Sequence, residues 1–277
     1  MKRYSLLKRF LIWRLKHVSN KNFLIILSVL IGFAVGIAAV IIKNTVFFIE
    51  HLLTQGFAIQ YQNYLYFLYP AIGILATVLF IRYVLKKRVG HGIPTVLYSI
   101  SRTSGIIQRH NMFSSVITSA LTVGFGGSVG LEGPTVATGA AIGSNTGRLL
   151  HLNYKEITSL LGFACAGAMA AIFKAPIAAI VFVLEVIMLD LTMAMLVPLL
   201  TASATAALTS YFFLGQDVLY PFEPETGFYF KDVPYYLIFG VFAGFFSVYF
   251  TRMYMSVTSI FEKINKWHMR LLLGAAT

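Results

Sequence analysis

One carboxylate stands in an apolar, glycine-rich stretch of the chain, GFGGSVGLEGPTVATGAAIGSNTG, at residues 124–147. It belongs to Glu132, which has Gly130 and Gly133 around it and Pro134 just after. Glycine followed by proline favours a helix start, whose first N–H groups have no partner inside the helix and attract an anion. A carboxylate placed there can occupy the anion's position and leave it when it is protonated or displaced. The alternative is a glutamate that only complements the dipole of the helix.

A second motif of the same design, GHGIP, covers Gly90 to Pro94. Its glycines free the backbone and Pro94 fits the first turn of a helix, so N–H groups again point out of a helix start. On its own, this motif could equally be an ordinary Gly-Pro turn. Together, the two motifs indicate a pair of helix starts suited to a small anion. Nucleotide binding is not indicated, because GFGGSVG lacks the G-x-G-x-x-G spacing and no G-K-S/T sequence follows it.

The helices that hold these motifs are expected in a membrane. Of the 277 residues, 58% are hydrophobic and only 12% are charged, whereas a soluble domain carries about 25% charged residues. The mean hydropathy is +0.78. The long apolar runs are continuous rather than alternating, which argues against a membrane β-barrel. We therefore expect an all-α membrane protein that crosses the membrane several times.

The charge distribution predicts how the chain is oriented. The formal net charge is +12, but Lys and Arg gather at the ends of apolar segments, where they set topology, so the charge does not indicate nucleic-acid binding. Residues 1–21 interleave basic residues with Leu, Ile, Trp and Phe, which predicts an amphipathic helix on the cytoplasmic membrane surface rather than a cleavable signal peptide. The N-terminus is thus expected in the cytoplasm and the protein in the cell (inner) membrane. The single cysteine, Cys165, excludes a disulfide framework.

The apolar segments differ in length. Two long segments come first, at residues 22–53 and 64–85, and the second ends in the basic sequence RYVLKKR, which returns the chain to the cytoplasm. The segments between residues 89 and 189 are shorter and are broken by Gly and Pro. Broken helices at membrane depth are tolerated only where they are buried in protein or line a cavity, so they indicate a transport pathway. Two more long segments follow, at residues 191–214 and 234–263, on either side of a polar segment that we place outside the cell.

Three motifs, GHGIP, GLEGP and GAMAAIFKAPIAAIVFVLE, stand in the order and at about the spacing found in the CLC family of chloride channels and proton-coupled chloride antiporters. The chain resembles that family from about residue 22 onward. The resemblance implies a CLC-type fold with tilted, broken transmembrane helices and transport of chloride without any cofactor. It also implies a homodimer, with a contact expected on residues 177–186 and 191–211. The small residues of TASATAALTS would permit close helix approach there.

The resemblance divides the chain into three parts. Residues 1–21 are the cytoplasmic amphipathic helix, and residues 22–214 are the first membrane repeat. Residues 215–277 are an external loop and the first helix of a second, inverted repeat, which is truncated. The chain therefore resembles the N-terminal half of a longer protein.

The resemblance also assigns residues to the anion pathway. Glu132 matches the gating glutamate, which blocks the anion path and carries protons in antiporters. Glu185 and Val186 match a pair whose second member is the internal proton acceptor in many antiporters. We expect no metal ligand and no enzyme, because no second catalytic group accompanies Glu132 in the sequence. The two motifs that match the anion-binding loops and helix starts contribute Gly90, His91, Gly92, Ile93, Pro94, Gly130, Leu131, Gly133 and Pro134.

Several positions depart from the family pattern. His91 replaces a serine, which leaves the preferred anion open, and a histidine that only packs is the alternative. Leu131 replaces a basic residue, and Glu185 is expected to be a structural acid rather than a transport group. Val186 cannot titrate, which favours a channel of the voltage-gated type over a proton-coupled antiporter of chloride or fluoride, although some antiporters lack that glutamate. A fragment that transports nothing is the third hypothesis.

Overall fold

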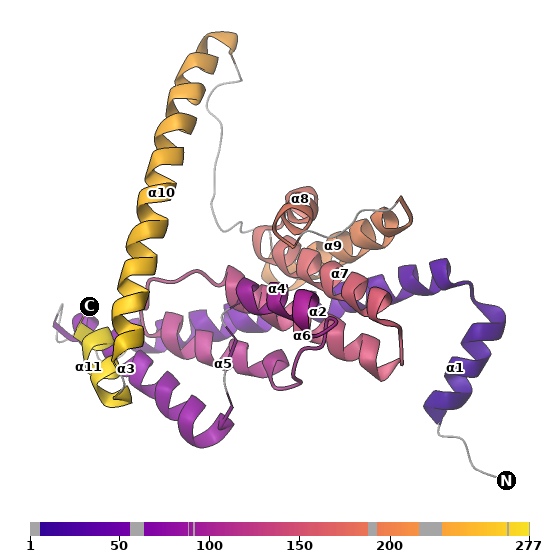
Figure 1. Cartoon of the computed structure of the whole chain (residues 1–277), viewed down its shortest axis with the longest axis horizontal. Coiled ribbons are helices and arrows are strands. Elements are labelled where there is room, and N and C mark those ends of the chain that lie inside the picture. The colour runs from indigo at the N-terminus through magenta and orange to yellow at the C-terminus, as the bar shows by residue number, and fades with distance from the viewer. Residues whose placement is uncertain are drawn as a thin grey trace. The chain divides into compact units, whose positions relative to one another are not determined.

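A computed structural model describes residues 6–55, 64–87, 89–90, 92–187, 193–215, 229–264 and 266–276. These residues form helices and no strand, which confirms the all-α prediction (Figure 1). They divide into two compact units, within residues 1–219 and 220–277. The first unit contains α1 (Leu6–His17), α2 (Asn20–Gln55), α3 (Tyr64–Leu79), the π-helix η2 (Phe80–Leu85), α4 (Ile93–Arg102), α5 (Asn111–Gly124), α6 (Glu132–Leu149), α7 (Tyr154–Phe173), α8 (Pro176–Val186) and α9 (Met193–Leu214).

The helices fall into long and short classes, as expected from the sequence. Helices α4, α5 and α8 have 10, 14 and 11 residues. At about 1.5 Å per residue they cannot cross a hydrocarbon core of about 30 Å, and they are the broken segments predicted between residues 89 and 189. The stretches long and apolar enough to cross a membrane are Asn20–Thr54, Leu68–Leu85, Tyr154–Phe173, Met195–Leu214 and Phe230–Lys263, which supports a multi-pass membrane protein.

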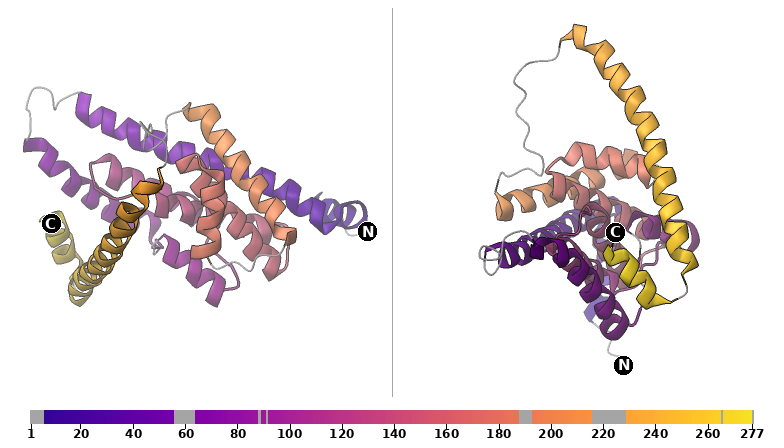
Figure 2. Two further views of the ribbon diagram at one scale, coloured as in Figure 1. Left: turned by 90° about the horizontal axis from the view of Figure 1, so that it is seen from above. Right: turned by 90° about the vertical axis from the view of Figure 1, so that its left-hand side faces the viewer.

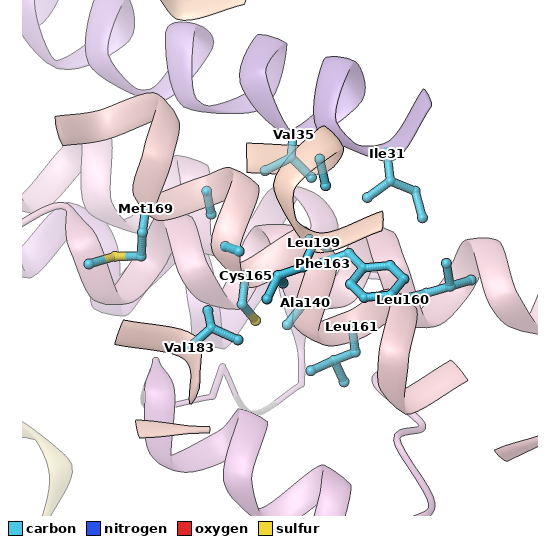
Figure 3. Packing of buried hydrophobic residues seen from close by; sticks show 14 of the residues in the cluster. Ile31, Val35, Ala140, Leu160, Leu161, Phe163, Cys165, Met169, Val183 and Leu199 are labelled. Atoms are coloured by element: carbon cyan, nitrogen blue, oxygen red, sulfur yellow. The ribbon is translucent and has the colours of Figure 1, made fainter. Parts of the chain in front are cut away.

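Helix α7 forms the centre of the first unit and contacts α2, α6, α8 and α9. It begins at a capping box, in which the Glu156 N–H donates to the Asn153 side chain (2.9 Å) and the Asn153 N–H donates to the Glu156 carboxylate (3.1 Å). It ends where Lys174 adopts a left-handed backbone and Pro176 starts α8. Figure 3 shows the apolar core at this helix, built from Leu160, Leu161, Phe163, Cys165 and Met169 of α7 and from Ile31, Val35, Ala140, Val183 and Leu199 of its four neighbours.

Small residues let the helices of this core approach closely. A Cβ added to Gly36 of α2 would lie 2.7 Å from the Cβ of Thr209 in α9, and one added to Gly167 of α7 would lie 3.3 Å from the Cβ of Ala206. Helix α9 accordingly runs alongside α2 in Figures 1 and 2. The small residues at 201–210 were expected in a contact between subunits. The buried ones among them pack against α2 and α7 of the same chain, and a subunit contact on the exposed face of α9 stays a prediction.

Helices α4 and α5 both contact α6, and hydroxyl groups fix their connections. The Ser144 hydroxyl in α6 accepts from the Ile107 N–H (3.0 Å) and donates to the Gly105 carbonyl (2.6 Å). It thereby ties the loop between α4 and α5 to α6. The hydroxyls of Thr77 and Thr122 lie 3.1 Å apart and join α3 to α5. The start of α6 is therefore held between two short helices whose positions are set by buried polar contacts.

The second unit contains η3 (Phe230–Asp232), α10 (Val233–Lys263) and α11 (Trp267–Ala276). Arg270 closes the turn between the two α-helices, since its Nε donates to the Ile264 carbonyl (2.5 Å) and its Nη2 donates to the Glu262 carbonyl (3.0 Å). A basic side chain that satisfies the last carbonyls of a helix is a common C-terminal cap. Most of the polar segment that the sequence analysis placed outside the cell, residues 216–228, lies outside the described residues.

Candidate functional site

The two helix starts predicted from the sequence meet in the structure. Helix α4 begins after Gly92, whose φ of 61° and ψ of −129° are essentially restricted to glycine. A Cβ on Gly92 would lie 3.2 Å from the Cα of Gly133, which belongs to the first turn of α6. The N-termini of α4 and α6 thus lie against each other with no side chain between them. Each N-terminus carries about half a positive charge and N–H groups that have no partner within their own helix.

Glu132 is the first residue of α6, and its side chain is half-buried. Its carboxylate folds back over Gly130, so closely that a Cβ at position 130 would overlap with a carboxylate oxygen. The backbone N–H and the hydroxyl of Thr135 donate to the carbonyl of Leu131 (3.1 and 2.8 Å) and close the first turn of the helix. No hydrogen bond or ion pair from the described residues holds the Glu132 carboxylate. The first turn of the helix is therefore fixed by hydrogen bonds, whereas none from the described residues fixes the carboxylate.

A cavity of about 200 Å³ opens beside the start of α6. It reaches Gly130 and Pro134 on either side of Glu132, and helix α5 supplies the hydroxyls of Thr118, Ser119 and Thr122 to its wall. The Thr118 and Thr122 hydroxyls donate to backbone carbonyls one turn earlier (both 2.9 Å). The Ser119 hydroxyl has no hydrogen-bond partner within the described part of the chain, so it can donate into the cavity. The sequence analysis missed this group.

The sequence contains a pattern that could have identified the polar face of helix α5. Hydroxyl residues recur at spacings of four along one helix face, at Ser114, Thr118 and Thr122 and again at Ser115 and Ser119. All of them except Thr122 are buried. Such a stripe in a short apolar segment is typical of a helix that turns a polar face to a pathway rather than to lipid.

The other predicted site residues are not part of the contact between Gly92 and Gly133. Gly90 precedes the start of α4 and packs against Thr95, while His91 lies outside the described residues. Glu185 and Val186 end α8, which packs mainly on α7 and α9, and the Glu185 side chain is exposed. Within the described residues, no group of His, Cys, Asp or Glu side chains is arranged to hold a metal ion.

Comparison with known proteins places these features in a family. The sequence profile described as voltage gated chloride channel matches residues 72–277. The H(+)/Cl(−) exchange transporter ClcA of Vibrio cholerae is 24% identical to the chain over 248 residues, which are 87% of the chain and 53% of that transporter. A solved structure of a CLC-type fluoride/proton antiporter superposes with a TM-score of 0.75 at 27% identity, over 92% of this chain and 63% of that one.

A slow cyanobacterial Cl−/H+ antiporter superposes with a TM-score of 0.77 at 19% identity, over 91% of this chain and 62% of that one, and at this identity the match shows the fold alone. The chain thus spans about half to three fifths of the length of these relatives. The broken helices, the meeting of two helix starts and the profile match agree with one another. The chain belongs to the voltage-gated chloride channel family, CLC.

Proposed function

We propose that this chain forms part of the anion pathway of a proton-coupled chloride exchanger. The observation that carries the proposal is the backbone contact of the α4 and α6 starts at Gly92 and Gly133, next to the carboxylate of Glu132, which has no hydrogen bond or ion pair among the described residues. Chloride binds at this meeting point, and Glu132 competes with it for the same N–H groups.

The physical basis is the charge of the two helix ends. Each contributes about half a positive charge within its first turn, and the effective dielectric around a membrane-embedded site is far below that of water. The N–H groups replace the hydration shell that chloride loses on entry. No basic side chain is needed at the α6 start, and Leu131 supplies none. An anion is therefore attracted without the tight binding that a buried Lys or Arg would give.

Glu132 acts as the gate because it is an anion that cannot diffuse away. In its charged form it occupies the position of chloride, and protonation removes its attraction to the helix start. The Ser119 hydroxyl lines the cavity that receives either the carboxylate or the ion. Chloride movement is thereby linked to the protonation of one side chain.

An exchanger fits the relatives better than the channel favoured by the sequence analysis. The similar protein from Vibrio cholerae is named an H(+)/Cl(−) exchange transporter, and the two similar structures are proton-coupled antiporters. Val186 still offers no proton acceptor, so on this chain the coupled proton is assigned to Glu132 alone. Fluoride is the second candidate substrate, because the 27% identical structure is that of a fluoride/proton antiporter.

The proposal includes the orientation of the protein in the membrane and its oligomeric state. The last turn of α1 carries Arg14, Lys16 and His17, and the loop after η2 carries Lys86 and Lys87. Basic residues concentrate on the cytoplasmic side of membrane proteins, which supports the proposal that both of these ends lie in the cytoplasm. The proposed location of the protein is the cell (inner) membrane. Two copies form a homodimer, each with its own pathway.

The experiment measures chloride and proton movement together. The protein is reconstituted in chloride-loaded liposomes, with a chloride electrode and a pH electrode outside. We expect chloride efflux to drive protons inward against their gradient. Glu132→Gln is expected to keep the chloride flux and abolish the proton flux, whereas Glu185→Gln, which removes an exposed carboxylate on α8, is expected to change neither.

The remaining outcomes reject the proposal in different ways. Chloride flux without uphill proton movement in the wild type would identify a channel. Absence of any anion flux would identify a chain that does not transport by itself. Proton movement that persists in Glu132→Gln would assign the coupled proton to another residue.

A further inference from the structure

A basic pocket of about 650 Å³ is built by three separate elements: the turn after η2, the loop that precedes α5, and the last turn of α6. Its described lining residues are Lys87, Gln108, Arg109, His110 and Arg148. None of them belongs to the GHGIP or GLEGP motif. Gln108 also lines a neighbouring cavity that reaches Gly90.

The pocket gathers positive charge without compensating it. Lys87, Arg109 and Arg148 are basic side chains, and no carboxylate is among the described lining residues. In the described part of the chain none of these three side chains forms an ion pair, and helix α5 begins at the pocket with no acidic residue in its first turn. Converging like charges repel one another, so the arrangement favours a bound anion.

The polar groups of the pocket are partly ordered already. His110 is buried, and its Nε2 lies 2.7 Å from the Gln108 amide oxygen while its Nδ1 lies 3.3 Å from the Ser114 hydroxyl. Arg148 reaches the Ile107 carbonyl (3.4 Å) with Nη1. These contacts orient His110 and Arg148, and all three strongly basic side chains, Lys87, Arg109 and Arg148, are exposed and can approach a ligand from outside.

Exposed apolar side chains stand next to the lining residues in the sequence. Phe113 follows the lining residues at the start of α5 and is 51% exposed, Leu149 follows Arg148 and is 57% exposed, and Val84 precedes Lys87 and is 70% exposed. A site for a soluble anion has no use for an apolar rim. A headgroup site needs one, because the acyl chains leave the pocket along it. Basic pockets between helices at the cytoplasmic membrane surface bind anionic lipid headgroups in this way.

We propose that this pocket binds the phosphate group of an anionic phospholipid from the adjacent leaflet. Lys87, Arg109 and Arg148 pair with the phosphate oxygens, and the exposed apolar side chains contact the upper part of the acyl chains. The charge of the pocket places it at the same membrane side as the other basic ends of the chain. Free inorganic phosphate shares the phosphate chemistry but not the apolar rim, and this difference allows the two sources to be told apart.

The test compares lipid binding by native mass spectrometry of the purified protein in detergent. Phosphatidylglycerol, which is anionic, is titrated against phosphatidylcholine, which is zwitterionic. In Lys87→Gln/Arg109→Gln we expect the tightest phosphatidylglycerol site to weaken by about fivefold for each cation removed. Lys155→Gln is the matched control, because Lys155 is exposed at the start of α7, close in sequence to Arg148, and does not line the pocket. It should leave the affinity unchanged.

Two further measurements complete the test. Lys87→Arg/Arg109→Lys keeps both charges and should restore binding, which a loss of fold would not allow. Addition of inorganic phosphate should leave the phosphatidylglycerol site occupied. Equal phosphatidylglycerol binding by wild type and the double Gln variant would overturn the assignment of the pocket. Displacement of the lipid by inorganic phosphate at the same sites would overturn the lipid source in favour of a soluble phosphate.

Discussion

Gly92 and Gly133 bring the first turns of α4 and α6 into backbone contact, with 3.2 Å between a Cβ built on Gly92 and the Cα of Gly133. Because neither residue has a side chain, nothing separates the two positive helix ends. The proposed chloride site follows from this contact, since either helix start alone would offer only half of the charge.

Replacement of Gly92 tests the contact. Gly92→Ala adds a Cβ at a positive φ and against the backbone of α6, so we expect a loss of roughly 1–3 kcal/mol in the free energy of unfolding together with weaker chloride binding. Thermal unfolding in detergent and calorimetric chloride titration measure the two effects. Gly240→Ala is the control, because the structure leaves open space at that position in α10. Unchanged chloride affinity in Gly92→Ala would mean that the contact of the two helix starts does not form the anion site.

Ser119 is the hydroxyl that the structure leaves available to the cavity. We expect Ser119→Ala to weaken chloride binding by about tenfold, which corresponds to one lost hydrogen bond to a charged group of about 1.5 kcal/mol. Calorimetric chloride titration measures this change in affinity. Ser115→Ala, one turn earlier on the same helix and outside the cavity lining, should bind chloride normally. Equal affinities for the two variants would remove Ser119 from the site.

Lys174 is a buried lysine that joins the ends of two helices. Its Nζ donates to the Gly215 carbonyl just after α9 (2.6 Å) and lies 5.0 Å from the ring centre of Tyr211. Lys174→Met is expected to lower the free energy of unfolding by roughly 1.5–3 kcal/mol, since a charged hydrogen bond is lost inside the protein. Lys155→Met, which removes an exposed lysine, should have little effect on thermal unfolding. A similarly small effect of Lys174→Met and Lys155→Met on thermal unfolding would show that the buried hydrogen bond of Lys174 does not stabilise the protein.

His110 makes stability depend on pH. Burial and the neighbouring Lys87 lower the pKa of His110 from its ordinary value of 6.5. Below pH 6.5 the unfolded chain then binds more protons than the folded protein, so the free energy of unfolding falls as the pH drops from 6.5 toward the folded-state pKa. His110→Gln should flatten thermal stability over this window. A pH profile identical to that of the wild type would mean that His110 does not titrate differently on folding.

The helix pattern was predictable from the sequence because it depends on local signals. The glycine and proline residues of the GHGIP and GLEGP motifs fix the starts of α4 and α6. The long apolar segments fix α2 and α10, where expected and observed ends agree within a few residues. The place of Glu132 at a helix start follows from the same signals. No local signal says which side chains meet across helices, and for that reason the contact of Gly92 with Gly133 could not be derived.

Two features were missed for a physical reason. The sequence contains the stripe of serine and threonine residues on α5, but only the placement of α6 shows which cavity this stripe lines. The basic pocket draws residues from three separate segments, each of which by itself looks like a topology signal at the end of a helix. In both cases the function of a residue depends on a partner that is distant in the sequence.

The most direct test of the account is to locate the anion. Crystals of the protein grown in bromide, which replaces chloride and scatters anomalously, would show where the ion binds. We predict an anomalous peak within hydrogen-bonding distance of the first N–H groups of both α4 and α6, with higher occupancy in Glu132→Gln than in the wild type, because the competing carboxylate is then neutral. Absence of a peak at the contact of Gly92 and Gly133, or an equal occupancy in both proteins, would contradict the proposal that Glu132 and the anion share one site.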